Sequence, residues 1–255
     1  MSFGNSTVNR IAALAAALYL CVGSAVLAQD AVPAEILSHT RLIKAGDVEG
    51  TAFSIDHGGR LYLVTARHLV AGLPESNATI QIRQADEWKD YHTVRTLFPS
   101  SAEADIAVFE TAEKVSQPFK VTCEPKTGGV TMGQQVWFLG FPYGGMGSRW
   151  SSGEAPFIKR GTMSAIVGTN PDAVILYIDG FNNPGFSGGP IVYWNFDTHS
   201  YAIVGVVMGY KEDTAKVLVN GVHMDTQLLV NSGILIGYSI QHALQAIDKG
   251  QEKPH

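Results

Sequence analysis

The sequence Asn183-Pro184-Gly185-Phe186-Ser187-Gly188-Gly189-Pro190 lies in the C-terminal third of the chain, between two apolar runs. A serine in a turn rich in glycine and proline is typical of an exposed nucleophile. Gly185 lets the backbone bend so that successive N–H groups can point at one place, and Gly188 and Gly189 leave room for a substrate chain. The stretch predicts a nucleophilic Ser187, with the N–H groups of Gly185 and Ser187 stabilising an oxyanion.

Two partners for this serine lie upstream. His68 follows the strand-like run Leu63–Arg67, and Asp105 opens the run Asp105–Val108. A serine hydroxyl is a weak nucleophile unless an adjacent base accepts its proton, which His68 is suited to do. Asp105 would hold the imidazole in one tautomer and stabilise its protonated form. The chain has eight histidines, so a chance pairing is easy, but three local patterns in this order favour a catalytic triad.

The N-terminus has the pattern of a targeting segment. Arg10 supplies a positive charge, Ile11–Leu20 is apolar, and Val26-Leu27-Ala28 offers small residues before a polar start at Gln29. This order predicts a signal peptide over residues 1–28 and a mature chain over 29–255, without stable membrane insertion after cleavage. An uncleaved anchor is the alternative, since the apolar stretch is near the lower length limit for spanning.

Charge and cysteine content narrow the class of protein. The formal net charge of −5 argues against nucleic acid as a partner. Cleavage after Ala28 would leave Cys123 as the one cysteine, which excludes an intramolecular disulfide and favours a bacterial periplasmic or secreted protein. We expect Cys123 to be a buried apolar residue. The histidines show no metal-ligand spacing, so neither a metal nor another cofactor is expected.

The 27 glycines and 11 prolines separate many short apolar runs, which favours an all-β fold. A polar leader is expected over 29–45 and a connector over 116–129. The connector separates the two halves of the mature chain, 29–120 and 121–255. Residues 240–248 are spaced for a helix, expected to dock on the second half. An irregular stretch is expected over 211–231, with a hairpin turn at Asn220-Gly221. The expected strands cover residues 50–55, 61–65, 78–82, 91–97, 105–110, 135–139, 161–167, 173–178, 190–194, 201–208 and 234–240.

With these motifs in view, the chain resembles the trypsin-like serine peptidases, in the bacterial HtrA/DegP-type branch. The resemblance covers nearly all of the mature chain. It rests on Gly50–Phe53 with Val64–Val70, on Asp105–Val108, on Gly133–Gly144, on Asn183–Pro190 and on Gly237–Ile240 with the final helix. It implies a chymotrypsin-like fold of two six-stranded antiparallel β-barrels with a short C-terminal helix. It also implies protein or peptide substrates, a triad of His68, Asp105 and Ser187, and Gly185 as oxyanion donor.

The sequence departs from the family pattern in several places. It stops after the final helix, so no PDZ module is expected. Phe186 stands where zymogen-type relatives carry an aspartate that pairs with a new N-terminus, so that activation is not expected. Phe181 stands where trypsin-like members carry an acidic pocket base, which disfavours cleavage after Lys or Arg. We expect Phe181, Val207, Met208 and Gly209 to line a pocket for a small apolar side chain.

Two other functions remain open from the sequence. Gly185–Gly189 also fits the G-x-S-x-G pattern of α/β-hydrolase esterases, but that fold needs a helix after the serine, and Gly188-Gly189-Pro190 opposes one. The second alternative is a catalytically silent protease fold that acts as a binding or chaperone module. An intact triad can stand beside a collapsed oxyanion turn, so the sequence leaves this alternative open.

Overall fold

The computed structural model describes residues 31–114, 119–124, 129–145, 148–150 and 153–252. The chain divides into two compact units, Met1–Pro33 and Ala34–His255, and the fold is that of the second unit. The predicted signal peptide, residues 1–28, lies outside the described residues. Within the described part, no helix is long and apolar enough to cross a membrane.

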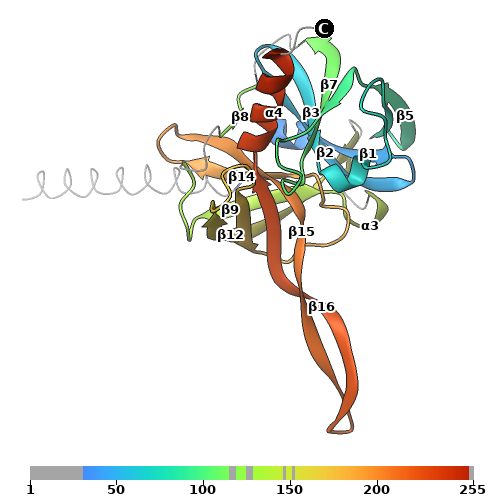
Figure 1. The fold of residues 1–255 in the computed structure, drawn as a ribbon, viewed down its shortest axis with the longest axis vertical. Coiled ribbons are helices and arrows are strands. Elements are labelled where there is room, and N and C mark those ends of the chain that lie inside the picture. Colours follow the sequence, from blue (N-terminus) through green and yellow to red (C-terminus); the bar gives the residue numbers. More distant parts are fainter. Residues whose placement is uncertain (1–30, 115–118, 125–128, 146–147, 151–152, 253–255) are drawn as a thin grey trace, which may run out of the picture. The chain divides into compact units, whose positions relative to one another are not determined.

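Seven antiparallel strands form the first sheet, in the order β5-β4-β1-β2-β3-β7-β6 (Figure 1). The helix α2 (Ala34–His39) precedes this sheet, and the short 3-10 helix η1 (Arg67–Val70) follows β3. An isolated bridge between Ser76 and Arg95 brings β6 to the segment that leads into β4. The strands are β1 (Thr40–Ala45), β2 (Val48–His57), β3 (Arg60–Thr65), β4 (Thr79–Gln84), β5 (Glu87–His92), β6 (Arg95–Leu97) and β7 (Ala107–Lys114).

The second sheet closes on itself. Its order is β14-β9-β12-β13-β16-β15-β8, and an additional pairing of β14 with β15 completes a six-stranded ring. The strand β8 lies outside this ring and pairs with β15 in parallel. The strands are β8 (Thr122–Cys123), β9 (Gln135–Gly140), β12 (Phe157–Val167), β13 (Ile175–Asp179), β14 (Pro190–Asn195), β15 (Ser200–Val219) and β16 (Val222–Ser239). The turn α3 (Pro142–Gly145) and the hairpin β10 (Ser148–Trp150) and β11 (Gly153–Ala155) lie between β9 and β12.

The predicted two-barrel fold is confirmed, with differences in the strand count. Residues 91–97 do not form one strand, because the N–H of Thr93 donates to Ala78 O (2.9 Å) and that of Val94 to Glu110 O (2.8 Å). The chain thereby passes from pairing with β4 to pairing with β7. Thr40–Ala45, expected within a polar leader, is the strand β1. The first sheet therefore has seven strands rather than six, and the second has the predicted six plus the parallel β8, where an all-antiparallel barrel was expected.

Each sheet encloses its own apolar core. The first core includes Ile43, Leu63 and Phe109, and the second includes Phe138 and Ile191. Burial of apolar surface of this kind supplies most of the stabilising free energy of a domain. The strands β1 and β2 of the first sheet also contact β9 of the second. The predicted catalytic residues lie outside the strands, in η1 and in the segments before β7 and β14.

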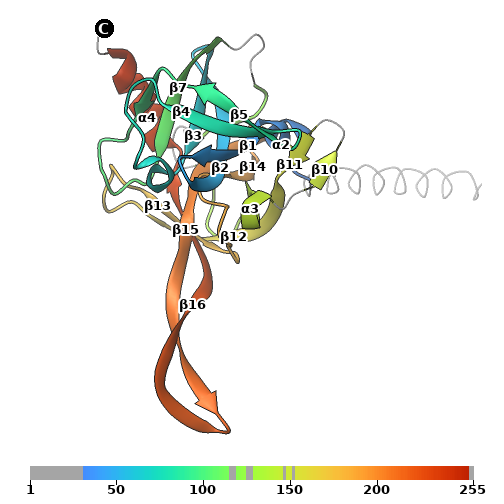
Figure 2. The ribbon, with the colours of Figure 1, turned by 90° about the vertical axis from the view of Figure 1, so that its right-hand side faces the viewer.

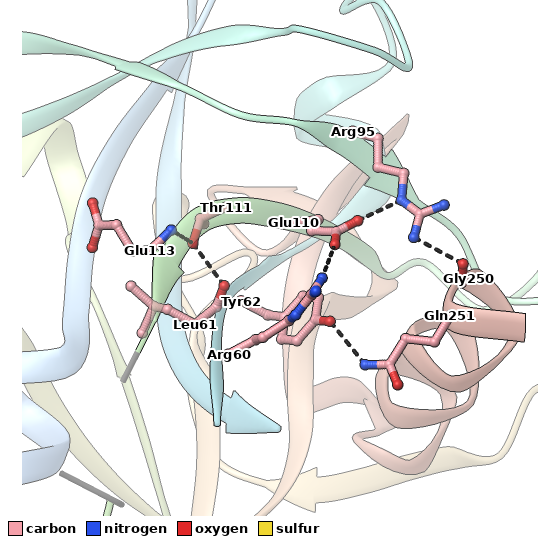
Figure 3. Close-up of polar contacts among 9 residues, drawn as sticks. All are labelled: Arg60, Leu61, Tyr62, Arg95, Glu110, Thr111, Glu113, Gly250 and Gln251. Atoms are coloured by element: carbon pink, nitrogen blue, oxygen red, sulfur yellow. Dashed lines mark hydrogen bonds and ion pairs between the residues drawn. The ribbon is translucent and has the colours of Figure 1, made fainter. Parts of the chain in front are cut away.

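The C-terminal helix α4 (Gln241–Glu252) ends on the first sheet, where the sequence analysis expected it on the second. Figure 3 shows its last turn beside the buried carboxylate of Glu110, which accepts hydrogen bonds from Arg95 and from Arg60 (3.0 Å). Arg95 also donates to the carbonyl of Gly250 (2.8 Å), and Gln251 donates to the Tyr62 hydroxyl (3.1 Å). A buried charge needs such partners. They join the end of the second half of the chain to the first sheet.

Cys123 lies in the two-residue strand β8. Burial raises the pKa of its thiol to about 12. The thiol is therefore protonated at neutral pH, and a protonated thiol is a poor nucleophile. Cys123 was expected to be buried, and by its residue exposure it is only partly buried.

Candidate active site

His68 lies in η1, immediately after the buried end of β3. Leu69 and Val70, which follow it, are buried in the first core and hold this short helix against the sheet. The imidazole itself is about half exposed. The sequence analysis placed His68 after a strand-like run, and in the structure it lies in the short helix that follows β3.

Asp105 contacts His68 at two points. Its Oδ1 accepts the backbone N–H of His68 (2.9 Å), and its Oδ2 lies 2.6 Å from Nδ1 of the imidazole. The carbonyl of Asp105 also accepts the N–H of Arg67 (3.3 Å). Because an ionised carboxylate can only accept, Nδ1 carries the proton and Nε2 is left as the basic nitrogen. The two predicted partners are thus in contact, in the tautomer that a general base requires.

The loop that carries Ser187 depends on two glycines. The N–H of Phe186 donates to Asn183 O (3.3 Å), which closes a turn with Pro184 and Gly185 at its centre. Gly185 has φ 100°, a conformation that only glycine adopts without strain.

Gly188, the second of these glycines, has φ 82° and lies against the first sheet. A Cβ at this position would be 2.1 Å from the carbonyl oxygen of Thr51 and 2.3 Å from Oγ1 of Thr65. Glycine at this position therefore lets the serine loop approach the elements that carry His68.

Thr51 is a site residue that the sequence analysis did not single out. Its N–H donates to the carbonyl of Ser187 (2.9 Å), and its Oγ1 donates to the carbonyl of Gly185 (2.7 Å). The same Oγ1 accepts the N–H of Phe141 (3.1 Å). One fully buried threonine thus holds the serine loop from the first sheet. The only sequence signal was its place in the Gly50–Phe53 motif, which gave no contact partner.

The hydroxyl of Ser187 points to the second sheet. Its Oγ donates to the carbonyl of Met208 (2.9 Å). Met208 is an extra residue in β15, because Val207 pairs with Gly237 while Gly209 pairs with the neighbouring residue of β16. Such a bulge redirects the backbone groups of a strand. Among the described residues, no hydrogen bond joins Ser187 to His68, so the structure brings two of the three predicted residues into direct contact.

The predicted oxyanion donors are free of protein acceptors. Across the described ranges, neither the N–H of Gly185 nor that of Ser187 donates to another residue, whereas the N–H of Gly188 donates to Val207 O (2.8 Å) and that of Gly189 to Phe186 O (2.9 Å). Two unpaired donors beside a serine hydroxyl are suited to bind a negatively charged oxygen.

The residues expected to form a specificity pocket are in different environments. Phe181 is more than half exposed, and Met208 and Gly209 are partly exposed. Val207 is fully buried within the second core, so only its backbone can face a substrate. Any contribution of Val207 to the wall of the predicted pocket therefore comes from its backbone, because its side chain lies in the second core.

Lys159 lies beside Phe181, the position at which trypsin-like members carry a carboxylate. Lys159 Nζ donates to the carbonyl of Phe181 (2.8 Å) and to the side chain of Asn183, and it lies 5.3 Å from the centre of the Phe186 ring. Burial lowers the pKa of Lys159. The charge close to this segment is therefore positive.

Nothing among the described residues suggests a metal centre, since no group of three or more His, Cys, Asp or Glu side chains is placed to hold an ion. After Ser187 the chain enters the strand β14, not a helix. An α/β-hydrolase requires a helix there, so the structure removes the esterase alternative.

Comparison with known proteins identifies a family that matches this chain. A model of the trypsin-like peptidase domain matches residues 50–199. Among solved structures, an inactive mutant form of the protease Rv3671c from M. tuberculosis is 16% identical, with a TM-score of 0.54, over 87% of this chain and 91% of that one. The HtrA-type protease AlgW with a tripeptide is 20% identical, with a TM-score of 0.53, over 86% of this chain and 63% of that one.

These identities show a shared fold, and the predicted resemblance to HtrA-type proteases is confirmed at that level. No curated protein matches the sequence. The matched domain spans more than half of the chain and includes His68, Asp105 and Ser187. The chain therefore belongs to the trypsin-like peptidase family and is a serine endopeptidase.

Proposed function

We propose that this endopeptidase hydrolyses protein or peptide substrates with Ser187 as nucleophile, His68 as general base and Asp105 as the carboxylate that orients it. Nε2 of His68 takes the hydroxyl proton as Oγ attacks the scissile carbonyl, and an acyl-enzyme forms when the protonated imidazole gives that proton to the leaving amine. Water then hydrolyses the acyl-enzyme by the same route. The double contact of Asp105 with His68 is the observation that carries this proposal.

The N–H groups of Gly185 and Ser187 stabilise the oxyanion of the tetrahedral intermediate. Removal of one such donor typically costs about 2.7–4 kcal/mol of transition-state stabilisation. The Thr51 hydroxyl supports the arrangement because its hydrogen bond fixes the carbonyl of Gly185 (2.7 Å).

Catalysis requires the Ser187 hydroxyl to leave Met208 and turn to His68. A serine hydroxyl can rotate between staggered positions about one side-chain torsion, and substrate-free active sites often have looser catalytic hydrogen bonds. The hydrogen bond to Met208 is thus a resting contact of the nucleophile.

The substrate pocket accepts a small apolar side chain before the cleaved bond. Phe181, Met208, Gly209 and the backbone of Val207 form its walls, and the cation of Lys159 disfavours a substrate Lys or Arg beside Phe181. Export to the periplasm or outside the cell follows from the signal-like residues 1–28. No cofactor takes part in this chemistry.

The test is covalent labelling of the purified protein with a fluorophosphonate, together with cleavage of an unstructured protein substrate. Ser187→Ala should abolish both, and Asp105→Asn should lower kcat by about 10⁴-fold because the imidazole takes the wrong tautomer. Ser54→Ala is a matched control, since Ser54 lies in β2 with no side-chain hydrogen bond in the described part of the chain.

Labelling that persists in Ser187→Ala would reject Ser187 as nucleophile. A folded wild type that is neither labelled nor active would favour the second alternative, a protease fold that binds without cleaving. The observation that favours this binding alternative is that the Ser187 hydroxyl donates to Met208 and not to His68.

A further inference from the structure

The strands β15 and β16 continue far beyond the second sheet. From Lys211 to Asn231 they form a two-stranded ribbon, and Figures 1 and 2 show it leaving the two sheets in both views. The nine residues from Lys211 to Val219 span about 30 Å at the rise of a β-strand. Asn220 (φ 51°) and Gly221 (φ 78°) form the turn at the tip.

The ribbon has no third strand among the described residues. Its two strands pair with each other from Glu212 and Asn231 to Val219 and Val222, and β13 meets β16 only beyond this, from Ile234 onward. An isolated two-stranded hairpin is at best marginally stable in water. A ribbon of this length is therefore expected to have a covering partner.

Apolar side chains on the ribbon point to the same conclusion. Val222 is 64% exposed and Leu229 is 70% exposed. Exposed apolar patches of this kind mark interaction surfaces. We call two sets the tip group and the middle group: the tip group is Leu218, Val219, Val222 and Met224, and the middle group is Leu228, Leu229 and Val230.

The two edges of the ribbon differ in charge. The β15 edge carries four charged side chains within Lys211–Lys216, whereas Val222–Asn231 on the β16 edge carries only Asp225 at neutral pH. Charged side chains protect an exposed strand from pairing with another chain. The β16 edge lacks that protection, so it is the edge open to a further strand.

The pairing of the two ribbon strands is interrupted at one place, where β16 has more residues than β15. The register shifts between Lys216 and Leu218, so that Met224, Asp225 and Thr226 lie opposite Val217 alone. The backbone groups of these three residues cannot all be satisfied by β15. A second strand at this edge would satisfy them.

We propose that two copies of the chain associate through the β16 edges of their ribbons, antiparallel, about a two-fold axis near Thr226. In that register Val222 faces Val230 of the second copy and Met224 faces Leu228, so each tip group meets a middle group. Asp225 faces Gln227, which keeps like charges apart. A two-fold contact needs a surface complementary to itself, and this order of residues provides one.

A membrane surface fits the ribbon less well. The segment 211–231 has two lysines, three carboxylates and no aromatic residue. Membrane-surface elements favour Lys and Arg with Trp or Tyr at the interface. The antiparallel arrangement also leaves the two catalytic units at opposite ends, since each ribbon extends away from its own sheets.

The test is sedimentation velocity on the protein produced from the whole coding sequence, at about 1–100 µM, where standard-sized interfaces associate. The wild type should be a dimer, and Met224→Lys and Leu228→Glu should each give a monomer. The double variant M224K/L228E should dimerise again, because each lysine then faces a glutamate of the second copy. Lys216→Glu on the opposite edge is the control and should remain dimeric.

A wild type that is monomeric over the whole range would overturn the proposal, as would single variants that stay dimeric. A monomer that binds vesicles of phosphatidylcholine and phosphatidylglycerol, and loses binding in Leu228→Glu, would assign the ribbon to a membrane instead. Unchanged circular dichroism and fluorophosphonate labelling in each variant would exclude misfolding. The proposal does not depend on the proposed function, because sedimentation requires no catalysis.

Discussion

The same two strands have opposite environments on the two sides of Met208. In the sheet, Tyr201–Val207 and Leu235 are buried, and in the ribbon Leu218 and Leu229 are more than half exposed. Valine and leucine occur in both parts, so the difference in their burial comes from neighbours: β14 and β13 flank the first part, and no described strand flanks the second. Strand formation alone does not create a core, and the hydrogen bond from Ser187 to Met208 lies near the boundary between the two parts.

The largest effect is expected from a change at Gly188 in the serine loop, which contacts the first sheet and donates a hydrogen bond to Val207 in the buried part of β15. Gly188→Ala places a Cβ 2.1 Å from the Thr51 carbonyl oxygen, at φ 82°, so the loop must move away from the first sheet. A displacement of about 1 Å at a catalytic group can cost roughly 10²-fold in rate, and we expect at least that loss in kcat/KM. Unchanged peptide hydrolysis would mean that the close approach is unnecessary. Gly168→Ala is the control, because Gly168 follows β12 and a Cβ there would lie in open space.

A matched pair of leucines measures the comparison directly. Leu235→Ala in the second core should destabilise the fold by about 2–5 kcal/mol, because it leaves a cavity. Leu218→Ala at the ribbon tip should change the free energy of unfolding by less than about 0.5 kcal/mol. Urea unfolding in dilute solution, followed by tryptophan fluorescence, gives both values. Equal effects would show that the ribbon is part of the cooperative fold.

A pH effect is expected where β16 runs on into α4. Nε2 of His242 accepts the N–H of Val174 (2.8 Å), which requires the neutral ring. Burial lowers the pKa of His242 from its usual 6.5, with opposing contributions from Gln245 and Asp172. The unfolded chain therefore binds a proton first, so stability is complete above about pH 6.5 and falls as the pH drops below it.

The variant His242→Gln removes this titration and keeps an acceptor. The fall in Tm between pH 7.5 and pH 5 should be smaller in the variant than in the wild type. An identical pH profile in both proteins would assign the acid sensitivity to other groups.

The smallest effect is expected from removal of the ribbon. Replacement of Glu212–Val230 by a short turn should leave fluorophosphonate labelling of Ser187 within about twofold. This variant keeps Asn231, whose side chain donates to the carbonyl of Asn182 (2.6 Å) beside the serine loop. Loss of labelling would instead show that the ribbon supports the buried part of β15 and thereby the carbonyl of Met208.

Sequence reasoning located the turns better than the long pairings. The turn at Asn220-Gly221 is present as predicted, since both residues adopt the positive φ that such a turn needs. The expectation of an irregular stretch over 211–231 was wrong: these residues continue the paired strands β15 and β16, with two register shifts that no local pattern reveals. Thr40–Ala45 was missed for a similar reason: Arg41 and Lys44 give it a polar appearance, and only pairing with β2 and β4 makes it a strand.

By itself the sequence determined the two-barrel fold, the family, and the glycines and turns around Ser187, because local sterics specify where a chain can bend and which residues can be exposed. Only the tertiary structure decided that Thr51 holds the serine loop, that Met208 accepts the Ser187 hydroxyl, and that α4 ends on Arg95 and Tyr62 of the first sheet. These are contacts between residues far apart in the chain. They depend on register shifts and on the packing of two sheets, which no local pattern encodes.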